Sequence, residues 1–204
     1  LGVKVSAVST EFEQGELTAS TGDFDFAIQG NGFFMIEMPD GTTGYTRNGN
    51  FLMAINPNGG TTLTTADGYS VLDSNGKAIT FDAATDTTRL SFDNYGNIFY
   101  KNAQGVIQPT GVRIGAAQFN NPSGLTKLGD SYFAESAASG NARIEGQDAA
   151  LSISVIKNGY LEASSVQAVD EMVDMIVTQR AYEMNSKAIT ASDEMLQQAN
   201  NLRS

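Results

Sequence analysis

The C-terminal part of the chain, residues 166–202, is the one long segment in which apolar residues recur with a helical period and no Gly or Pro interrupts them. Its central stripe repeats every seven residues, and further apolar residues flank that stripe. The seven-residue series is Leu161, Ala168, Met175, Tyr182, Ile189 and Leu196, and the flanking residues are Ala181, Ala188, Met195, Leu202, Val177, Met184 and Ala191. The pattern predicts a long helix with a broad stripe of the coiled-coil type.

The polar residues ahead of this segment predict where the helix begins. Gln167 follows Ser164 by three positions, and the acids Asp170 and Glu171 come next. A hydroxyl residue followed in this way by Gln is typical of a capping box, and acids stabilise the positive N-terminal end of a helix. We therefore expect the helix to begin near Ser164 or Ser165.

The expected length of the helix has a consequence for its partners. At about 1.5 Å per residue, a helix of about 38 residues would be roughly 57 Å long, more than a compact domain of this mass can cover. Most of its apolar face should therefore contact other helices, and the apolar residues between Met172 and Val177 suggest burial on more than one side. The alternative is an ordinary amphipathic helix that folds back on its own domain.

The residues before the helix form short apolar segments separated by turn residues. Asn-Gly and Asp-Gly pairs favour tight hairpins because they supply positive φ angles, and they recur here about every ten residues. The structural turn glycines are expected to be Gly30, Gly32, Gly41, Gly49 and Gly68. Strands are expected at 24–28, 33–38, 44–46, 51–54, 61–65, 69–72, 90–92, 98–101, 105–107, 111–119, 131–135, 142–145 and 151–156.

These patterns predict a mainly β fold, a hairpin-rich β domain with one long C-terminal α-helix of the coiled-coil type. The expected divisions are an extended lead-in at residues 1–23, a β-rich domain at 24–157 and the helix at 158–204. The pair Asn158-Gly159 is expected to mark the change from the last strand to the helix.

Composition narrows the possible functions. The chain has 204 residues, a net charge of −11, and neither Cys nor His. Disulfides and thiolate sites are thereby excluded, and the commonest metal ligand and general base are missing. An acidic chain without clustered Lys and Arg does not favour nucleic acid or an anionic membrane as a partner. No run of 18 apolar residues occurs, so no membrane-spanning segment is expected.

Four candidate sites are better explained as structure. Residues 30–32 form a G-x-G, but a strand rather than a helix follows it, so a dinucleotide site is not expected. Residues 73–76 resemble the start of a calcium loop, yet Ala84 stands where the bidentate Glu belongs, which favours a hairpin turn. The acid pairs at 23 and 25 and at 170 and 171 could be the two carboxylates of a glycosidase, but solvated or helix-capping roles are expected instead. Arg180 is expected to pair with Glu183 or Asp174, or with an acid on a packed neighbour.

Two separated stretches resemble one protein family. Residues 159–166 and 171–189 are similar to the C-terminal signature of the bacterial flagellar rod and hook proteins. Residues 25–34, 39–41 and 45–51 resemble the hairpin signature of the same family. Within the family, the chain is most similar to the branch that forms the distal rod. Hook subunits, which usually carry an additional outer domain, and proximal rod subunits are the alternatives.

The resemblance implies a structural subunit that polymerises helically into a hollow, torque-transmitting shaft, with terminal helices in the core and β domains outside. It also implies export by the flagellar type III apparatus and a place in the basal body, crossing the periplasm. The implied partners are copies of the chain, neighbouring rod and hook proteins, and the surrounding ring proteins. The assembly residues would be Val169, Met172, Val173, Met175, Ile176, Arg180, Tyr182, Met184, Ile189, Met195 and Leu196.

Two expectations complete the picture. The family has a further N-terminal helix that pairs with the C-terminal one, so we expect the chain to be a fragment that starts after it, and what covers the stripe here stays open. No catalytic, cofactor or metal site is expected, and the protein should not be an enzyme. The alternative from another class is a secreted glycan-binding β module with a helical stalk, which should gather its aromatic residues in one cleft.

Overall fold

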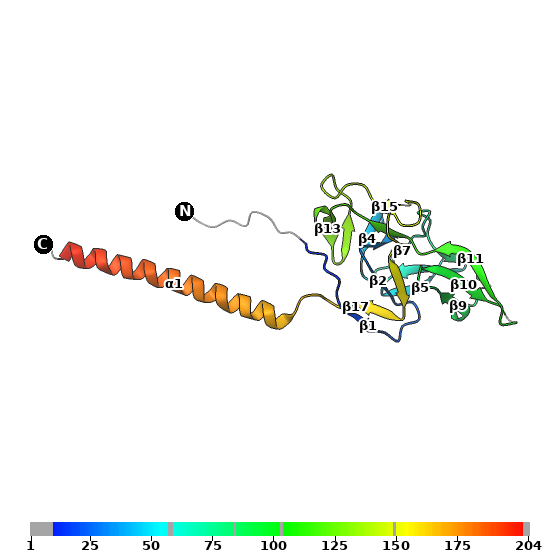
Figure 1. Ribbon diagram of the computed structural model, residues 1–204, viewed down its shortest axis with the longest axis horizontal. Helices are drawn as coiled ribbons and strands as arrows, with labels where there is room; N and C mark the ends of the chain where they lie inside the picture. Colours follow the sequence, from blue (N-terminus) through cyan, green and yellow to red (C-terminus); the bar gives the residue numbers. More distant parts are fainter. Residues whose placement is uncertain (1–9, 57–58, 84, 103, 149, 202–204) are drawn as a thin grey trace. The chain divides into compact units, whose positions relative to one another are not determined.

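The computed structural model describes residues 10–201 apart from 57–58, 84, 103 and 149. It has two compact units, a β body that ends at Ala163 and a second unit that begins at Ser164 and contains α1, Ala168–Asn201 (Figure 1). The mainly β fold with a long C-terminal helix is confirmed for the described residues. The first nine residues of the expected lead-in, and Leu202 of the apolar pattern, lie outside the described residues.

The largest sheet of the body contains ten strands among the described residues, and its pairs are antiparallel. Its main path runs β13 (Thr126–Gly129), β14 (Tyr132–Ala134), β4 (Thr43–Thr46), β3 (Phe33–Glu37), β7 (Ser70–Val71), β6 (Thr61–Thr65) and β5 (Phe51–Ile55). Off this path, β12 (Ala116–Gln118) pairs with β3 and with β15 (Arg143–Ile144), and β8 (Thr80–Phe81) pairs with β6.

Three smaller antiparallel sheets complete the described part of the body. One has the order β11 (Ile107–Arg113), β10 (Asn97–Lys101) and β9 (Leu90–Phe92). The second joins β16 (Val155–Asn158) to β2 (Phe26–Gln29), and the third joins β1 (Leu17–Ala19) to β17 (Tyr160–Glu162). The 3₁₀ turns η1 (Thr87–Arg89) and η2 (Pro122–Gly124) lie in connections. Figure 1 shows β1 and β17 side by side, although they come from opposite ends of the body's sequence.

Strand β3 is buried on both faces, and this divides the core. Its successive side chains point to opposite faces of the sheet, so an unbroken apolar run supplies both sides. Phe34 belongs to one buried cluster with Phe26, Phe51 and residues from several other strands. Phe33 and Met35 belong to a second cluster, which also contains Tyr45, Leu72, Ala117, Phe119 and Phe133.

Two of the turn glycines lie in tight antiparallel connections. Gly41 lies between β3 and β4 with φ 78°, and its N–H donates to the carbonyl of Met38 at 2.9 Å. Gly68 lies between β6 and β7 with φ 88°, and its N–H donates to Thr65 at 3.0 Å. A side chain in this left-handed region is strained, which explains glycine at both positions.

The other three turn glycines do not join paired strands. Gly30 (φ 137°) and Gly32 connect β2 to β3, which belong to different sheets. Gly49 connects β4 to β5, which also do not pair, and it is not among the residues with positive φ. Glycine is required there because a Cβ would lie 1.8 Å from the carbonyl oxygen of Phe26. The interpretation of 29–32 and 48–49 as hairpin turns is therefore wrong.

The sequence also misplaced three boundaries near the end of the body. The strand expected at 111–119 is divided into β11 and β12, because the chain between them turns toward Asp73, with which Ile114 forms an isolated bridge. The strand expected at 151–156 is formed only from Val155 onwards. Asn158-Gly159 leads into β17 and not into the helix, since Gly159 (φ 76°) connects two strands with different partners.

The two kinds of glycine give a stability prediction. Gly49→Ala is expected to destabilise the body by about 3 kcal/mol or more, because the new methyl group overlaps a buried backbone carbonyl that cannot rotate away. Gly41→Ala should cost only roughly 1 to 2 kcal/mol, because its Cβ meets nothing within 4 Å and only the positive φ is strained. Denaturant unfolding of both variants measures the difference, and equal losses would contradict this account.

Two buried tyrosines predict a loss of stability at alkaline pH. Burial raises the pKa of Tyr45 to about 12, and the charge of Glu135 acts in the same direction. Burial likewise raises the pKa of Tyr132 to about 12, together with the hydrogen bond from its hydroxyl to Asp67. Because tyrosine in an unfolded chain ionises near pH 10, the unfolded state holds fewer protons between about pH 10 and about pH 12.

The free energy of unfolding should therefore be independent of these two groups below about pH 10 and fall as the pH rises toward about 12. Tyr132→Phe should make this fall less steep, since one of the two groups no longer titrates. Denaturant unfolding over this pH range, with tyrosinate absorbance recorded in parallel, measures the slope. The same slope in wild type and variant would contradict the assignment of Tyr132.

Candidate assembly surface

Helix α1 contains 34 residues and begins at Ala168. The carbonyl of Gln167 accepts the first helical hydrogen bonds, from the N–H groups of Asp170 at 3.1 Å and Glu171 at 3.2 Å. The hydroxyl of Ser164 accepts instead from the N–H of Val166, two residues later and ahead of the helix. The expected capping box and a start at Ser164 or Ser165 are therefore wrong, because the serine side chain is used in a local turn.

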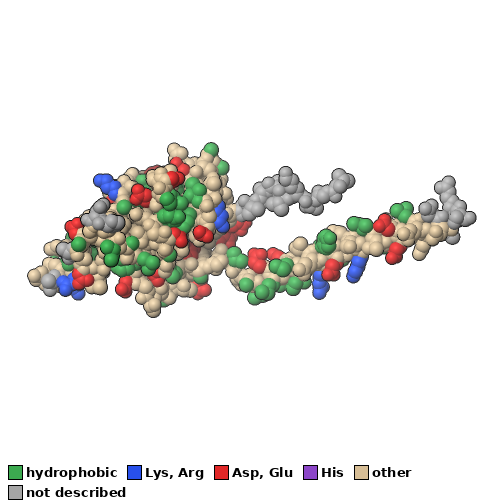
Figure 2. Space-filling model, turned by 180° about the vertical axis from the view of Figure 1, so that it is seen from behind, with side chains coloured by type: hydrophobic (Ala, Val, Ile, Leu, Met, Phe, Trp, Pro, Cys, Tyr) green, Lys and Arg blue, Asp and Glu red, His purple; other side chains and the backbone are tan. Residues whose placement is uncertain are grey.

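The apolar side chains of α1 are exposed in this chain. Each of the eleven large ones is between 50% and 77% exposed: Val169, Met172, Val173, Met175, Ile176, Val177, Tyr182, Met184, Ile189, Met195 and Leu196. Figure 2 shows apolar side chains along the length of the helix. Burying a side chain of this size contributes roughly 1.5 to 3 kcal/mol, so together they form a large surface for association.

Most apolar residues of α1 form two lines and not one broad stripe, and Val169, Met172 and Ile176 near its start lie outside both lines. Leu161 lies in β17 and pairs with Thr18, so it drops out of the seven-residue series. At about 100° per residue, the remaining series and the flanking residues lie on different sides of the helix, with Asp174, Asn185 and Ser192 between them. One line is Met175, Tyr182, Ile189 and Leu196, and the other is Val173, Val177, Met184, Ala188, Ala191 and Met195.

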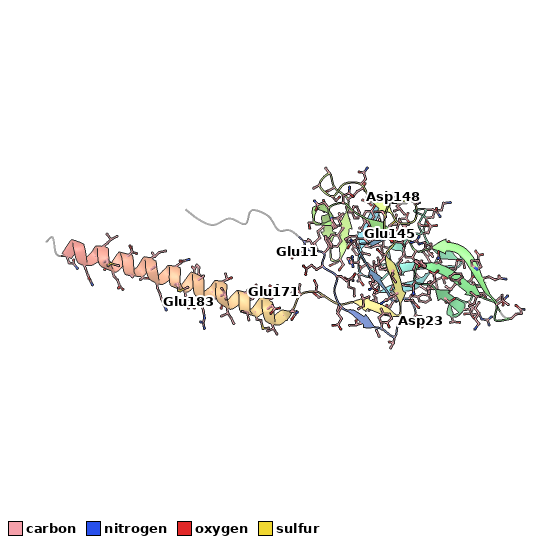
Figure 3. All side chains as sticks on the ribbon, viewed as in Figure 1. Glu11, Asp23, Glu145, Asp148, Glu171 and Glu183 are labelled. Carbon is pink, nitrogen blue, oxygen red and sulfur yellow. The ribbon has the colours of Figure 1, made fainter. Side chains whose placement is uncertain are left out.

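A polar face separates the two lines on the other side of α1. From Gln179 onwards, residues at helical spacings of three and four are polar there: Gln179, Glu183, Ser186, Thr190, Glu194 and Gln197. In the first turns of α1 the same face carries Met172 and Ile176. Glu183, which Figure 3 labels, lies on this face. Arg180 forms none of the ion pairs found among the described residues, which are Arg47–Glu162, Arg89–Asp86 and Arg143–Asp148. Its expected pairing with Glu183 or Asp174 is absent from this chain.

An ion pair at the end of the body joins segments that are distant in sequence. The Nε of Arg47 lies 3.0 Å from Oε2 of Glu162, and Nη2 lies 3.2 Å from Oε1. Nη1 donates to the carbonyl oxygens of Gly30 at 3.0 Å and Gly32 at 3.1 Å. The guanidinium lies 5.6 Å from the ring centroid of Phe33. We refer to Arg47 and Glu162 with these contacts as the Arg47 clamp.

A buried carboxylate lies behind the same loop. Glu145, labelled in Figure 3, is 1% exposed, and it accepts hydrogen bonds from the N–H and the hydroxyl of Ser154 and from Nε2 of Gln118. A Cβ at Gly32 would lie 2.7 Å from Oε1 of Glu145, and the N–H of Gly32 donates to the hydroxyl of Ser154. The carboxylate thus uses its oxygens to connect β15, β12 and the segment before β16.

The candidate sites considered from sequence have structural roles. The carboxylate of Asp73 accepts from the N–H groups of Asn75 and Lys77, as a hairpin turn requires. Asp25 is buried and accepts from Ser20 and Asn50, so the expectation that it is solvated is wrong, whereas Asp23 is exposed. Asp170 and Glu171 lie in the first turn of α1. Among the described residues no cluster of three or more acids is placed to hold a metal, and no helix is long and apolar enough to cross a membrane.

The aromatic residues of the body pack mainly against one another in the core. Phe26, Phe34 and Phe51 contact in one cluster, and Phe33, Phe119 and Phe133 in the other. Buried rings in edge-to-face contact stabilise the fold and leave their faces unavailable for stacking on a sugar. This distribution differs from the single aromatic cleft expected of a glycan-binding module.

Two family models match the chain. The first describes the C-terminal part of flagellar basal-body rod proteins FlgE, FlgF and FlgG and matches residues 157–202, which include β17 and α1. The second describes the D1 domain of flagellar hook protein FlgE/F/G and matches residues 27–100, in the β body. The β body and the helix thus define the class of flagellar rod and hook subunits.

Relatives that match most of the chain narrow the class. A flagellar basal-body rod protein FlgG of Bacillus subtilis is 43% identical over 91% of this chain and 68% of its own length. That of Borreliella burgdorferi is 38% identical over 99% of this chain and 73% of its own length. A hook protein FlgE of Borreliella burgdorferi is 37% identical, but over 58% of this chain and 29% of its own length. The chain belongs to the FlgG family of flagellar basal-body rod proteins.

Sequence reasoning did not single out Arg47, Glu162 or Glu145. Arg47 and Glu162 lie within the two stretches that resemble the family, but their pairing crosses 115 positions of the chain. Glu145 contacts Gln118 over 27 positions. Periodicity reports which face a residue occupies and carries no information on such distant partners.

Proposed function

We propose that this chain is a structural subunit of the flagellar distal rod, which polymerises helically into a hollow shaft that transmits torque. The observation that carries the proposal is α1, whose apolar side chains are exposed along the length of the helix in the free chain. A soluble monomer does not normally present so much apolar surface, and a surface of this kind marks an interface. The relatives are named as flagellar basal-body rod proteins, and a rod is an assembly in which such an interface is needed.

The two apolar lines of α1 support packing of the coiled-coil type between copies of the chain. A helix with apolar residues on two sides can contact neighbours on both, as a subunit inside a tube must. Contacts between different patches on successive copies do not close into a ring, and they generate an open helical polymer. In this arrangement α1 and its assembly residues, with Arg180 on the intervening polar face, form the core, and the β body forms the outer surface.

The remaining assignments follow from membership in the family. Neighbouring rod and hook proteins would bind the ends of the polymer, and the ring proteins of the basal body would surround it where it crosses the periplasm. The chain would be exported by the flagellar type III apparatus. A hook or proximal rod subunit is the alternative, and the high coverage of rod relatives compared with the hook relative favours the rod. The proposal assigns a structural role and no enzymatic activity.

The role of α1 can be tested with paired substitutions on its two faces. Met175→Asp combined with Ile189→Asp places charges in one apolar line and is expected to abolish polymerisation, because unpaired charges would be buried at the interface. Gln179→Asp combined with Ser186→Asp introduces the same two residues on the polar face and should leave assembly intact. Negative-stain electron microscopy for tubes of fixed diameter, with sedimentation of polymer, measures both.

The circular dichroism and melting of the β body should be the same in both double variants as in wild type. Normal tubes from Met175→Asp/Ile189→Asp would overturn the axial role of the helix. Monomeric particles from wild type in all assembly conditions would favour the glycan-binding module over the rod subunit.

A further inference from the structure

The Arg47 clamp lies beside β1 and β17, the first and the last strand of the β body. Four of the guanidinium donors of Arg47 are used, two on the carboxylate of Glu162 and two on the carbonyls of the 30–32 loop. The side chains are only 15% and 11% exposed. A planar, bidentate pair in this partly buried setting is stronger and more directional than an ion pair on the surface.

Glu162 extends the clamp to the incoming strand. Its Oε1 also accepts from the N–H of Gly15 at 2.9 Å, and the N–H of Ala163 donates to the carbonyl of Glu16 at 2.9 Å. A Cβ at Gly15 would lie 1.9 Å from the carbonyl oxygen of Ala163, so the segment just before β1 and the segment just after β17 approach closely there. The ion pair between Arg47 and Glu162 thus connects the segment just before β1, the end of β17 and the 30–32 loop.

The ribbon of β1 and β17 is short, and other bonds attach the adjoining chain to the body: the Gln14 side chain donates to the carbonyl of Ile28 and accepts from the N–H of Gly30, and the hydroxyl of Ser20 donates to Asp25. The ribbon consists of three residue pairs, and its side chains are exposed or half-buried. An isolated two-stranded ribbon is marginally stable in water, so its attachment depends on side chains that bind it to the body. The Arg47 clamp is such an attachment, and it acts at Glu162, the last residue of β17.

The chain continues from this ribbon into the assembly helix. Ala163 is the last residue of the β body, and α1 begins at Ala168. Any load carried from α1 to the body through the chain must therefore pass through the end of β17. We propose that Arg47 and Glu162 are positioning residues that lock the β1–β17 ribbon to the body and thereby couple the assembly helix to the β body in the polymer. This inference rests on the rod function proposed above.

The lock itself can be measured in the free subunit. Arg47→Met and Glu162→Gln each remove the ion pair, and they should accelerate amide hydrogen exchange at Ser20 and Ala163, whose N–H groups bond across the ribbon, by at least about tenfold. Exchange at Leu63, which donates to Ile79 within the core, should not change. Arg47→Lys keeps one charge but not the planar fork, and it should lie between wild type and Arg47→Met.

The matched control is Arg89→Met. It removes an arginine from an ion pair with Asp86 whose side chains are 43% and 47% exposed. This variant should leave exchange at Ser20, Ala163 and Leu63 as in wild type. Acceleration at Leu63 in the clamp variants would show a general loss of stability and would overturn a specific lock on the ribbon.

Coupling is measured by assembly. The clamp variants should give at least about tenfold less sedimenting polymer than wild type, although their helix content by circular dichroism is unchanged, and Arg89→Met should assemble normally. Slow exchange in the ribbon of the clamp variants, or fast exchange together with normal assembly, would overturn the proposal while leaving the rod function intact. If wild type forms no polymer, the rod function and the coupling both fail, and exchange in the free subunit still decides whether the clamp locks the ribbon.

Discussion

The antiparallel pairing of β1 with β17 is the constraint on which the arrangement of the subunit depends. Thr18 contacts Leu161 across 143 positions of sequence, so the pairing closes the β body after nearly all of its chain has been used. The incoming and outgoing strands thereby lie side by side. Because a ribbon of three residue pairs is only marginally stable by itself, its attachment relies on side chains that bind it to the body, Arg47 and Glu162 among them.

The β body and α1 satisfy opposite physical demands. In the body, even a fully buried carboxylate such as Glu145 has hydrogen-bond partners for its oxygens, and the apolar run of β3 is covered on both faces. In α1, the apolar side chains that should be covered are exposed, and the polar ones need no partner. The β body buries its two apolar clusters within one chain, whereas α1 leaves its apolar side chains exposed. This pattern is expected of a subunit whose remaining contacts are made in an assembly.

The features that the sequence predicted correctly are those set by neighbours in the chain. The turns at Gly41 and Gly68 follow from local φ requirements, and the helix follows from a periodicity sustained over many residues. The failures concern competing local bonds or distant partners. Ser164 bonds to Val166 in place of capping α1, and Gly49 is glycine because Phe26 approaches it. The Arg47 clamp is invisible to periodicity, since its segments are brought together only by the completed sheets.

The exposed helix also determines how folding and assembly are linked. An isolated helix draws only weak stability from its own hydrogen bonds, and most helical stability in proteins comes from packing of its apolar face. For α1 that packing is supplied by other chains in the proposed polymer, so the free energy that stabilises the helix depends on the concentration of subunits. The β body needs no such help, because its two clusters are complete within one chain. In the proposed polymer, such a subunit would keep its β body folded by its own contacts, while its helix would gain its full stability from neighbouring subunits.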